Sequence, residues 1–181
     1  INPVSREVWL AEVIPVVIIF FALVFTYRRF QFSHLAYALM AFWLFWHTIG
    51  GHYTFANVPF DWFNQFIPGE RNHFDRIGHF SIGFYAYAMA EWLLRKKYAK
   101  TVLVYSFSLF FIMSIAAAYE IIEWWYAALE GGDAGIEFLG SQGDIWDAQK
   151  DMLADTLGAV FSLLVYSRVR PDKHIIDRVK I

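Results

Sequence analysis

The chain has 181 residues, of which 58% are hydrophobic, 20% aromatic and only 18% charged, and its formal net charge is -2. A soluble domain of this size could hardly bury so much apolar surface, so the composition favours an exterior that faces lipid. The near-neutral charge argues against nucleic acid as a partner, and the absence of cysteine excludes disulfides, thiolate metal sites and cysteine nucleophiles.

Five segments have the length and apolarity of membrane spans, because crossing about 30 Å of hydrocarbon takes about 20 residues in a helix. Pro15 lies inside the first segment, where a membrane helix tolerates it. The sequence therefore predicts an all-α, polytopic transmembrane helical bundle, organised as a single domain over residues 1–181. The predicted spans are 8–27, 33–53, 75–94, 101–129 and 147–166.

Two longer connections join these spans. Residues 57–72 contain Pro59, Pro68 and Gly69 and are predicted to form an irregular loop. Residues 130–143 contain five glycines and are predicted to form a loop that returns to the membrane. Tryptophan and tyrosine near the outer ends of the spans are typical of an aromatic belt at the membrane interface. These residues are Trp9, Trp43, Trp46, Tyr53, Trp62, Trp124, Trp125 and Trp146.

The basic residues predict the orientation, since cytoplasmic connections are enriched in lysine and arginine. One side holds 11 of the 15 basic residues, and we expect it to be cytoplasmic. Ile1 then lies outside and Ile181 inside, which is consistent with a sixth span upstream in the full precursor. The 11 residues are Arg28, Arg29, Arg95, Lys96, Lys97, Lys100, Arg168, Arg170, Lys173, Arg178 and Lys180.

Ionisable residues within the spans are concentrated in the outer half of the bilayer. Counting inward from the charged boundaries places Glu120, Asp151 and Asp155 a turn or more inside. An ionised group in a membrane costs at least about 2.5–3.5 kcal/mol, so this convergence indicates a polar site. A bound cation, protons or basic neighbours must offset the repulsion between the carboxylates. The outer-half residues are Glu12, His47, His52, Asp75, His79, Glu120, Glu123, Asp144, Asp147, Asp151 and Asp155.

The residue types favour a divalent metal ion. Imidazole with carboxylates suits zinc, manganese or iron(II), whereas an all-oxygen subset suits magnesium or calcium, so the identity of the ion stays open. Glu120 and Glu123 at i, i+3, and Asp75 and His79 at i, i+4, have the spacing of ligands on bundle helices. If the protein is an enzyme, Glu120 or Glu123 is the predicted general base, acting on a metal-activated water. The predicted metal ligands are His79, Glu120, Asp144, Asp147 and Asp151.

Structural roles compete with this interpretation. Asp75 and Asp147 can be first-turn carboxylates that the helix dipole stabilises. His47 fits an ordinary hydrogen bond between helices. Glu91 lies at the cytoplasmic end of its span, one turn before Arg95, and is predicted to pair with it.

Four motifs resemble the YjdF-type family of small bacterial inner-membrane proteins. They are RNHFDRIGHF at Arg71–Phe80, YEIIEWW at Tyr119–Trp125, FLGSQGDIWDAQKDM at Phe138–Met152 and GGHYTFANVP at Gly50–Pro59. The resemblance spans nearly the whole chain and implies a multi-pass protein of the bacterial inner membrane, with an extra helix upstream. It implies no particular activity.

A weaker likeness is to VanZ-like membrane proteins, which are linked to glycopeptide resistance and so to the cell envelope. They open one helix with an Asp-x-x-x-His pair, end another with a glutamate, and open a final small-residue helix with an acidic motif. This chain lacks their Arg-rich approach to the last motif. The matching residues are Asp75, His79, Glu120, Asp147, Asp151 and Gly158.

The leading hypothesis is an outward-facing site of histidine and carboxylates that binds a cation and acts on an envelope lipid or lipid-linked substrate. Membrane lipid is thus the expected partner, alongside other membrane proteins or further copies of the chain. One alternative is an accessory or structural subunit of a larger membrane complex. Another is a small-solute or proton-coupled transporter, against which the inner half of the bundle shows no polar path and the spans no inverted repeat.

Overall fold

The computed structural model describes residues 2–67 and 70–173. Parts of the loop and orientation predictions fall on residues outside these ranges. These residues are Ile1, Pro68, Gly69, Arg178, Lys180 and Ile181.

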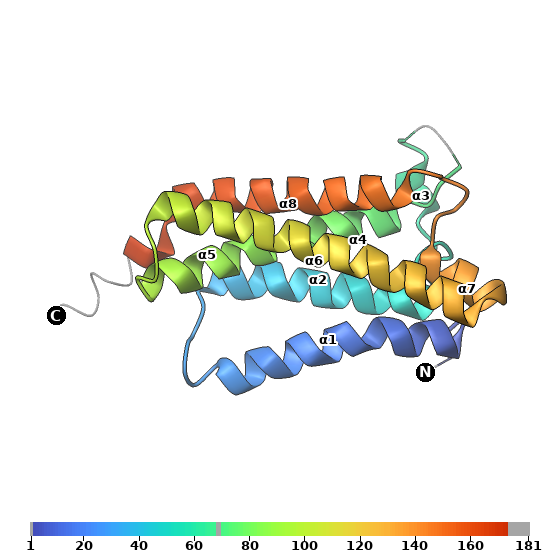
Figure 1. Cartoon of the computed structure of the whole chain (residues 1–181), viewed down its shortest axis with the longest axis horizontal. Coiled ribbons are helices and arrows are strands. Elements are labelled where there is room, and N and C mark those ends of the chain that lie inside the picture. Colours follow the sequence, from blue (N-terminus) through green and yellow to red (C-terminus); the bar gives the residue numbers. More distant parts are fainter. Residues whose placement is uncertain (1, 68–69, 174–181) are drawn as a thin grey trace.

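All the regular secondary structure in the described residues is helical, which confirms the all-α part of the predicted fold class. The long helices run side by side along the length of the molecule (Figure 1). The helices are α1 (Arg6–Thr26), α2 (His34–Tyr53), α3 (Asp61–Asn64), α4 (Phe74–Ile82), α5 (Tyr85–Arg95), α6 (Thr101–Glu130), α7 (Gly132–Leu139) and α8 (Asp147–Val169).

Three of the described helices are long and apolar enough to cross a membrane: Arg6–Thr26, Thr101–Glu130 and Asp147–Lys173. The predicted first, fourth and fifth spans correspond to them. The predicted second span corresponds to α2. Large apolar side chains cover much of the exterior, as expected where a helix faces lipid, and Phe25 and Phe45 are each 73% exposed.

The predicted third span is divided into α4 and α5 at Gly83 and Phe84. At the junction the amides of Phe84 and Ala86 bond carbonyls three residues back, which is the tighter 3₁₀ pattern. The Gly83 carbonyl also accepts a hydrogen bond of 3.0 Å from the Ser162 hydroxyl of α8. The sequence does not predict this division, because the apolar stretch continues across it without a helix-breaking residue such as proline.

Helix α8 packs against α4, α5 and α6, while α2 packs against α1, α4 and α5. The α4–α8 contact depends on two glycines. A Cβ at Gly158 would overlap the Phe80 carbonyl, and one at Gly83 would overlap backbone atoms of Asp155 and Ala159. The two helices therefore approach closely at both glycines. Gly78, also on α4, instead lies against the side chains of Trp46 and Phe55.

The prediction of a loop over residues 130–143 is wrong for residues 132–139, because they form α7, which packs against α6 and α1. Gly131 and Gly132 have φ of +64° and +56°, values that side chains disfavour, and they reverse the chain between α6 and α7. Gly135 then sits directly against the backbone of Ala127. The described parts of the other predicted loop, residues 57–67 and 70–72, are largely irregular, as predicted, but contain the single turn α3.

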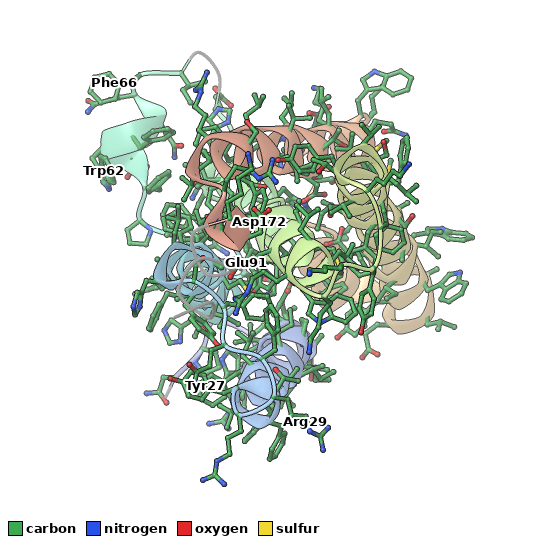
Figure 2. All side chains as sticks on the ribbon, turned by 90° about the vertical axis from the view of Figure 1, so that its left-hand side faces the viewer. Tyr27, Arg29, Trp62, Phe66, Glu91 and Asp172 are labelled. Carbon is green, nitrogen blue, oxygen red and sulfur yellow. The ribbon has the colours of Figure 1, made fainter. Side chains whose placement is uncertain are left out.

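Of the residues predicted to form an aromatic belt, some lie on the periphery, whereas two tryptophans of α2 lie in the interior. Trp62 is 64% exposed and projects from the side of the bundle (Figure 2). Trp43 is buried, and Trp46 stacks on Phe74 with ring centroids 4.2 Å apart and donates to the Phe74 carbonyl. These two residues stabilise the interior and do not mark the membrane interface.

A buried carboxylate, Glu91, lies near the end of the bundle that carries most of the described basic residues (Figure 2). Glu91 is fully buried and pairs with Arg95 at 2.7 Å, which confirms the predicted partner. It also accepts hydrogen bonds from the Ser33 amide and hydroxyl, at 2.8 and 2.6 Å. Glu91 therefore ties α5 to the start of α2.

Candidate functional site

The N-terminal ends of α4 and α8 bring aspartates and arginines together. Arg71, just before α4, contacts Asp75 at 3.0 Å and Asp147 at 2.8 Å. Arg76 contacts Asp147 at 2.6 Å and also forms an ion pair with Asp151. Two guanidinium groups thus neutralise part of the acidic cluster, which reduces the repulsion within it.

His79 lies one turn deeper and faces three carboxylates. Its Nε2 is 3.6 Å from an Asp75 oxygen and 3.7 Å from an Asp151 oxygen, and its Nδ1 is 3.3 Å from Asp155 Oδ2. One ligand atom each from Asp75, His79 and Asp151 lies within 4.8 Å of the others. Asp155 is 1% exposed, and its second oxygen, Oδ1, has no hydrogen-bond partner among the described residues.

This arrangement follows from helix periodicity and from the glycine contact. Asp75 and His79 are one turn apart on α4, and Asp147, Asp151 and Asp155 form one stripe on α8. All three members of the stripe are buried. The close approach of Gly83 and Gly158 fixes the two helices so that their polar stripes face each other.

A second polar group joins α1, α2 and α6. The Glu12 carboxylate oxygen Oε2 lies 3.0 Å from His47 Nε2 and accepts a hydrogen bond of 2.8 Å from the Tyr119 hydroxyl. His47 Nε2 is also 3.1 Å from the Glu12 backbone carbonyl oxygen. His47 therefore bonds between helices, the structural role that its position suggested. Glu12 and His47 are buried.

Both polar groups line one cavity of about 130 Å³. Helices α1, α2, α4, α6 and α8 line the cavity, and α7 contributes Glu137 and Phe138. The polar lining residues lie toward the end that holds the N-termini of α4 and α8, while Ile19 of α1 and Ile82 of α4 line the part nearer the middle of the bundle. The bundle thus contains a cavity in which ionisable side chains lie among apolar ones, where the sequence predicted only a convergence of charge.

The residues predicted as ligands fall into different environments. His79 and Asp151 belong to the three-residue cluster with Asp75, whereas Asp147 bonds to Arg71 and Arg76. Asp144 lies nearer the surface and contacts Lys150 at 2.6 Å.

The Lys150 ammonium and the Trp146 amide donate hydrogen bonds to Asp144 and hold the pKa of its carboxyl below the usual value. Asp144 is therefore an ionised residue paired with Lys150 at the rim, and it does not belong to the deeper His79 cluster.

The two predicted general bases also differ. Glu123 is buried and lines the cavity. Glu120 does not line it, although its Oε1 is buried without a hydrogen-bond partner among the described residues. Two polar residues that line the cavity were not predicted: Tyr119, one turn before Glu123 on α6, and Glu137 of α7. The i, i+4 spacing of Tyr119 and Glu123 was the available signal for the first, and α7 was not predicted.

Fold and site together define a helical integral membrane protein with a buried His/carboxylate cavity near one end of its bundle. The chain belongs to the family described as "Predicted membrane protein (DUF2238)", whose model matches residues 1–172. It is 37% identical over 167 residues to the inner membrane protein YjdF of Escherichia coli (strain K12), covering 91% of this chain and 79% of that protein. No solved structure matches the chain significantly. The resemblance read from the motifs is therefore confirmed.

Proposed function

We propose that the chain crosses the inner membrane five times, through α1, α2, α4 with α5, α6 and α8. Helix α2 has 20 residues, about 30 Å, and lies alongside the longer helices (Figure 1). The end of α1, the α5–α6 connection and the end of α8 share one end of the bundle, and they carry most of the described basic residues. We assign this end, and the C-terminus, to the cytoplasm.

Within this frame we propose that the protein binds a divalent metal ion through Asp75, His79 and Asp151. The observation that carries the proposal is the spacing of their ligand atoms, all within 4.8 Å of one another. Two ligands about 2.1 Å from a tetrahedral ion lie about 3.4 Å apart. The separations from His79 Nε2, 3.6 and 3.7 Å, are close to this value and too long for hydrogen bonds.

Charge balance supports a divalent ion. The α8 stripe, Asp75 and Asp144 supply five carboxylates, against the three cations Arg71, Arg76 and Lys150. With a neutral imidazole the cluster keeps two negative charges, which one divalent cation would neutralise. Because Arg76 already bonds Asp151 Oδ1, the ion would replace that contact or use Oδ2. One nitrogen with carboxylate oxygens suits manganese, iron(II) or zinc.

The chemistry open to such a centre is the activation of water. A bound divalent ion lowers the pKa of a coordinated water, and a carboxylate in the same cavity can accept its proton. Glu123 lines the cavity and Glu120 does not, so Glu123 is the better placed of the two predicted bases. Activity on an envelope lipid or lipid-linked substrate fits a site that lies within the outer half of the bundle.

A structural role is the competing proposal, because Arg71 and Arg76 already form ion pairs across the cluster. The cluster would then hold α4 against α8, as part of a subunit of a larger assembly. Metal content separates the two accounts.

The test uses purified protein in neutral detergent, loaded separately with manganese, iron(II) or zinc and then desalted. We expect about one ion per chain, and a melting temperature that falls on chelation. His79→Gln and Asp151→Asn should lose the ion, whereas Glu130→Gln, at an exposed position on α6, should keep it. Wild-type protein without stoichiometric metal and without a response to chelator would refute the metal site and leave the structural role.

A further inference from the structure

The ionisable side chains that line the cavity are mainly acidic, and they lie among apolar ones. They are six carboxylates with two histidines, and no lysine or arginine lines the cavity among the described residues. Arg71 and Arg76 lie outside the lining and approach the aspartates from the rim. If a ligand of this cavity is charged, the charge must be positive, since an anion would meet uncompensated repulsion.

The proposed metal site uses only one part of this lining. Glu12 and Glu123 face the cavity from α1 and α6, and neither belongs to a described group of three or more side chains close enough to share an ion. Glu123 is only 8% exposed and lines the cavity, and its carboxylate takes part in none of the hydrogen bonds or ion pairs found among the described residues. A buried carboxylate without a partner is costly, so this position calls for a cationic ligand.

The neighbours of these carboxylates suit an organic cation. Trp43, His47 and Phe55 place aromatic rings along the same cavity, and His47 lies 4.7 Å from Trp43 and 5.2 Å from Phe55 between ring centroids. Ammonium groups are attracted to aromatic faces as well as to carboxylates. The Glu12 carboxylate is already held by His47 and Tyr119, so it is fixed in place for a ligand.

The packing of α1 indicates where such a ligand comes from. The cavity is lined by α1, α2, α4, α6, α7 and α8, yet α1 packs mainly against α2 and α7 and, apart from the Glu12–Tyr119 hydrogen bond, makes no extended contact with α6. Both views place α1 at the edge of the bundle, away from α8 (Figures 1 and 2). The nearby outer faces of these helices are apolar: Ile14 and Ile18 are 56% and 62% exposed, and Ile122 is 49% exposed.

The volume limits the part of the ligand that is enclosed. At about 130 Å³ the cavity is slightly smaller than an engineered cavity of about 150 Å³ that holds benzene. It has room for a head group of about six non-hydrogen atoms, and an attached chain would have to lie outside, against the apolar faces of α1 and α6.

We propose that Glu12 and Glu123 bind the ammonium head group of an amphiphile that enters from the membrane between α1 and α6. This proposal rests on the proposed function, because it names the class of lipid that would enter the same cavity. The carboxylates that would bind the head group, Glu12 and Glu123, are not among the proposed metal ligands. The expected substrate class is an amine-bearing lipid.

The test measures binding of dodecylamine to the full chain in neutral detergent with chelator present, so that its outcome is independent of the metal. Calorimetry should give one site per chain for dodecylamine and none for 1-dodecanol, which has the same chain without the charge. Butylamine, the head without the chain, should bind at least tenfold more weakly.

Glu123→Gln should weaken dodecylamine binding at least tenfold, and Glu130→Gln, on the same helix but exposed, should not. Thermal unfolding of both variants establishes whether they are folded. If Glu123→Gln does not fold, Glu12→Gln takes its place in the test. Equal binding of dodecanol, equal affinity for butylamine, or unchanged affinity in the folded glutamate variants would each overturn the proposal. Failure of the metal test alone would leave it standing.

Discussion

The contact between Gly158 and α4 links the stability of the bundle to the geometry of the site. A Cβ at residue 158 would overlap the Phe80 carbonyl oxygen and lie 2.8 Å from its carbonyl carbon. Non-bonded carbons prefer about 3.5–4.0 Å, so Gly158→Ala requires α4 and α8 to separate by about 1 Å. Overpacking of this kind costs about 1–3 kcal/mol.

The same movement should loosen the His79 cluster, whose members come from these two helices. The distance of 3.3 Å between His79 Nδ1 and Asp155 Oδ2 would grow to about 4 Å, beyond hydrogen-bonding range. Gly158→Ala is therefore expected to lower both the free energy of unfolding and the affinity for a divalent ion. Unfolding in mixed micelles and metal titration measure the two effects.

Gly78→Ala is the matched control, because a Cβ there meets its nearest neighbour at an ordinary 3.6 Å. It should be neutral or stabilise the fold by about 0.4–1 kcal/mol. Wild-type stability in Gly158→Ala, or an equal loss in Gly78→Ala, would show that the α4–α8 approach does not limit the packing.

Three further expectations concern the ends of the bundle. Glu91→Ala should destabilise the fold by about 3–5 kcal/mol, because it leaves a partly buried guanidinium unpaired; a loss under about 1 kcal/mol on denaturant unfolding would contradict this. The lowered pKa of Asp144 means that its ion pair with Lys150 is complete above the ordinary aspartate value and is lost as the pH falls through the lower, folded value. Lys150→Met should raise that pKa in an NMR titration of labelled aspartate, and an unchanged midpoint would exclude the pairing. Because the chain has no cysteine, single cysteines at Lys97 and Asp133 can be labelled in intact cells, and only the one at Asp133 should react from outside; labelling of both would reverse the topology argument.

The sequence by itself determined the positions of the long helices and the polar face of α8. Hydropathy over about 20 residues is a local property, so the predicted spans agree closely with α1, α2, α6 and α8. The spacing of Asp147, Asp151 and Asp155 likewise fixes one helix face whatever that face contacts, and all three are buried.

Only the tertiary structure decided which polar groups meet. Glu12 bonds Tyr119 across 107 residues of sequence and contacts His47 across 35, and no local pattern specifies such pairs. The division at Gly83 was likewise not predicted, because its neighbours are backbone atoms of another helix, α8, which no local pattern specifies. A sequence pattern defines which side of a helix is polar, but the rotation and neighbours of that helix depend on packing against the whole bundle. That packing gathered residues from separate spans around one cavity.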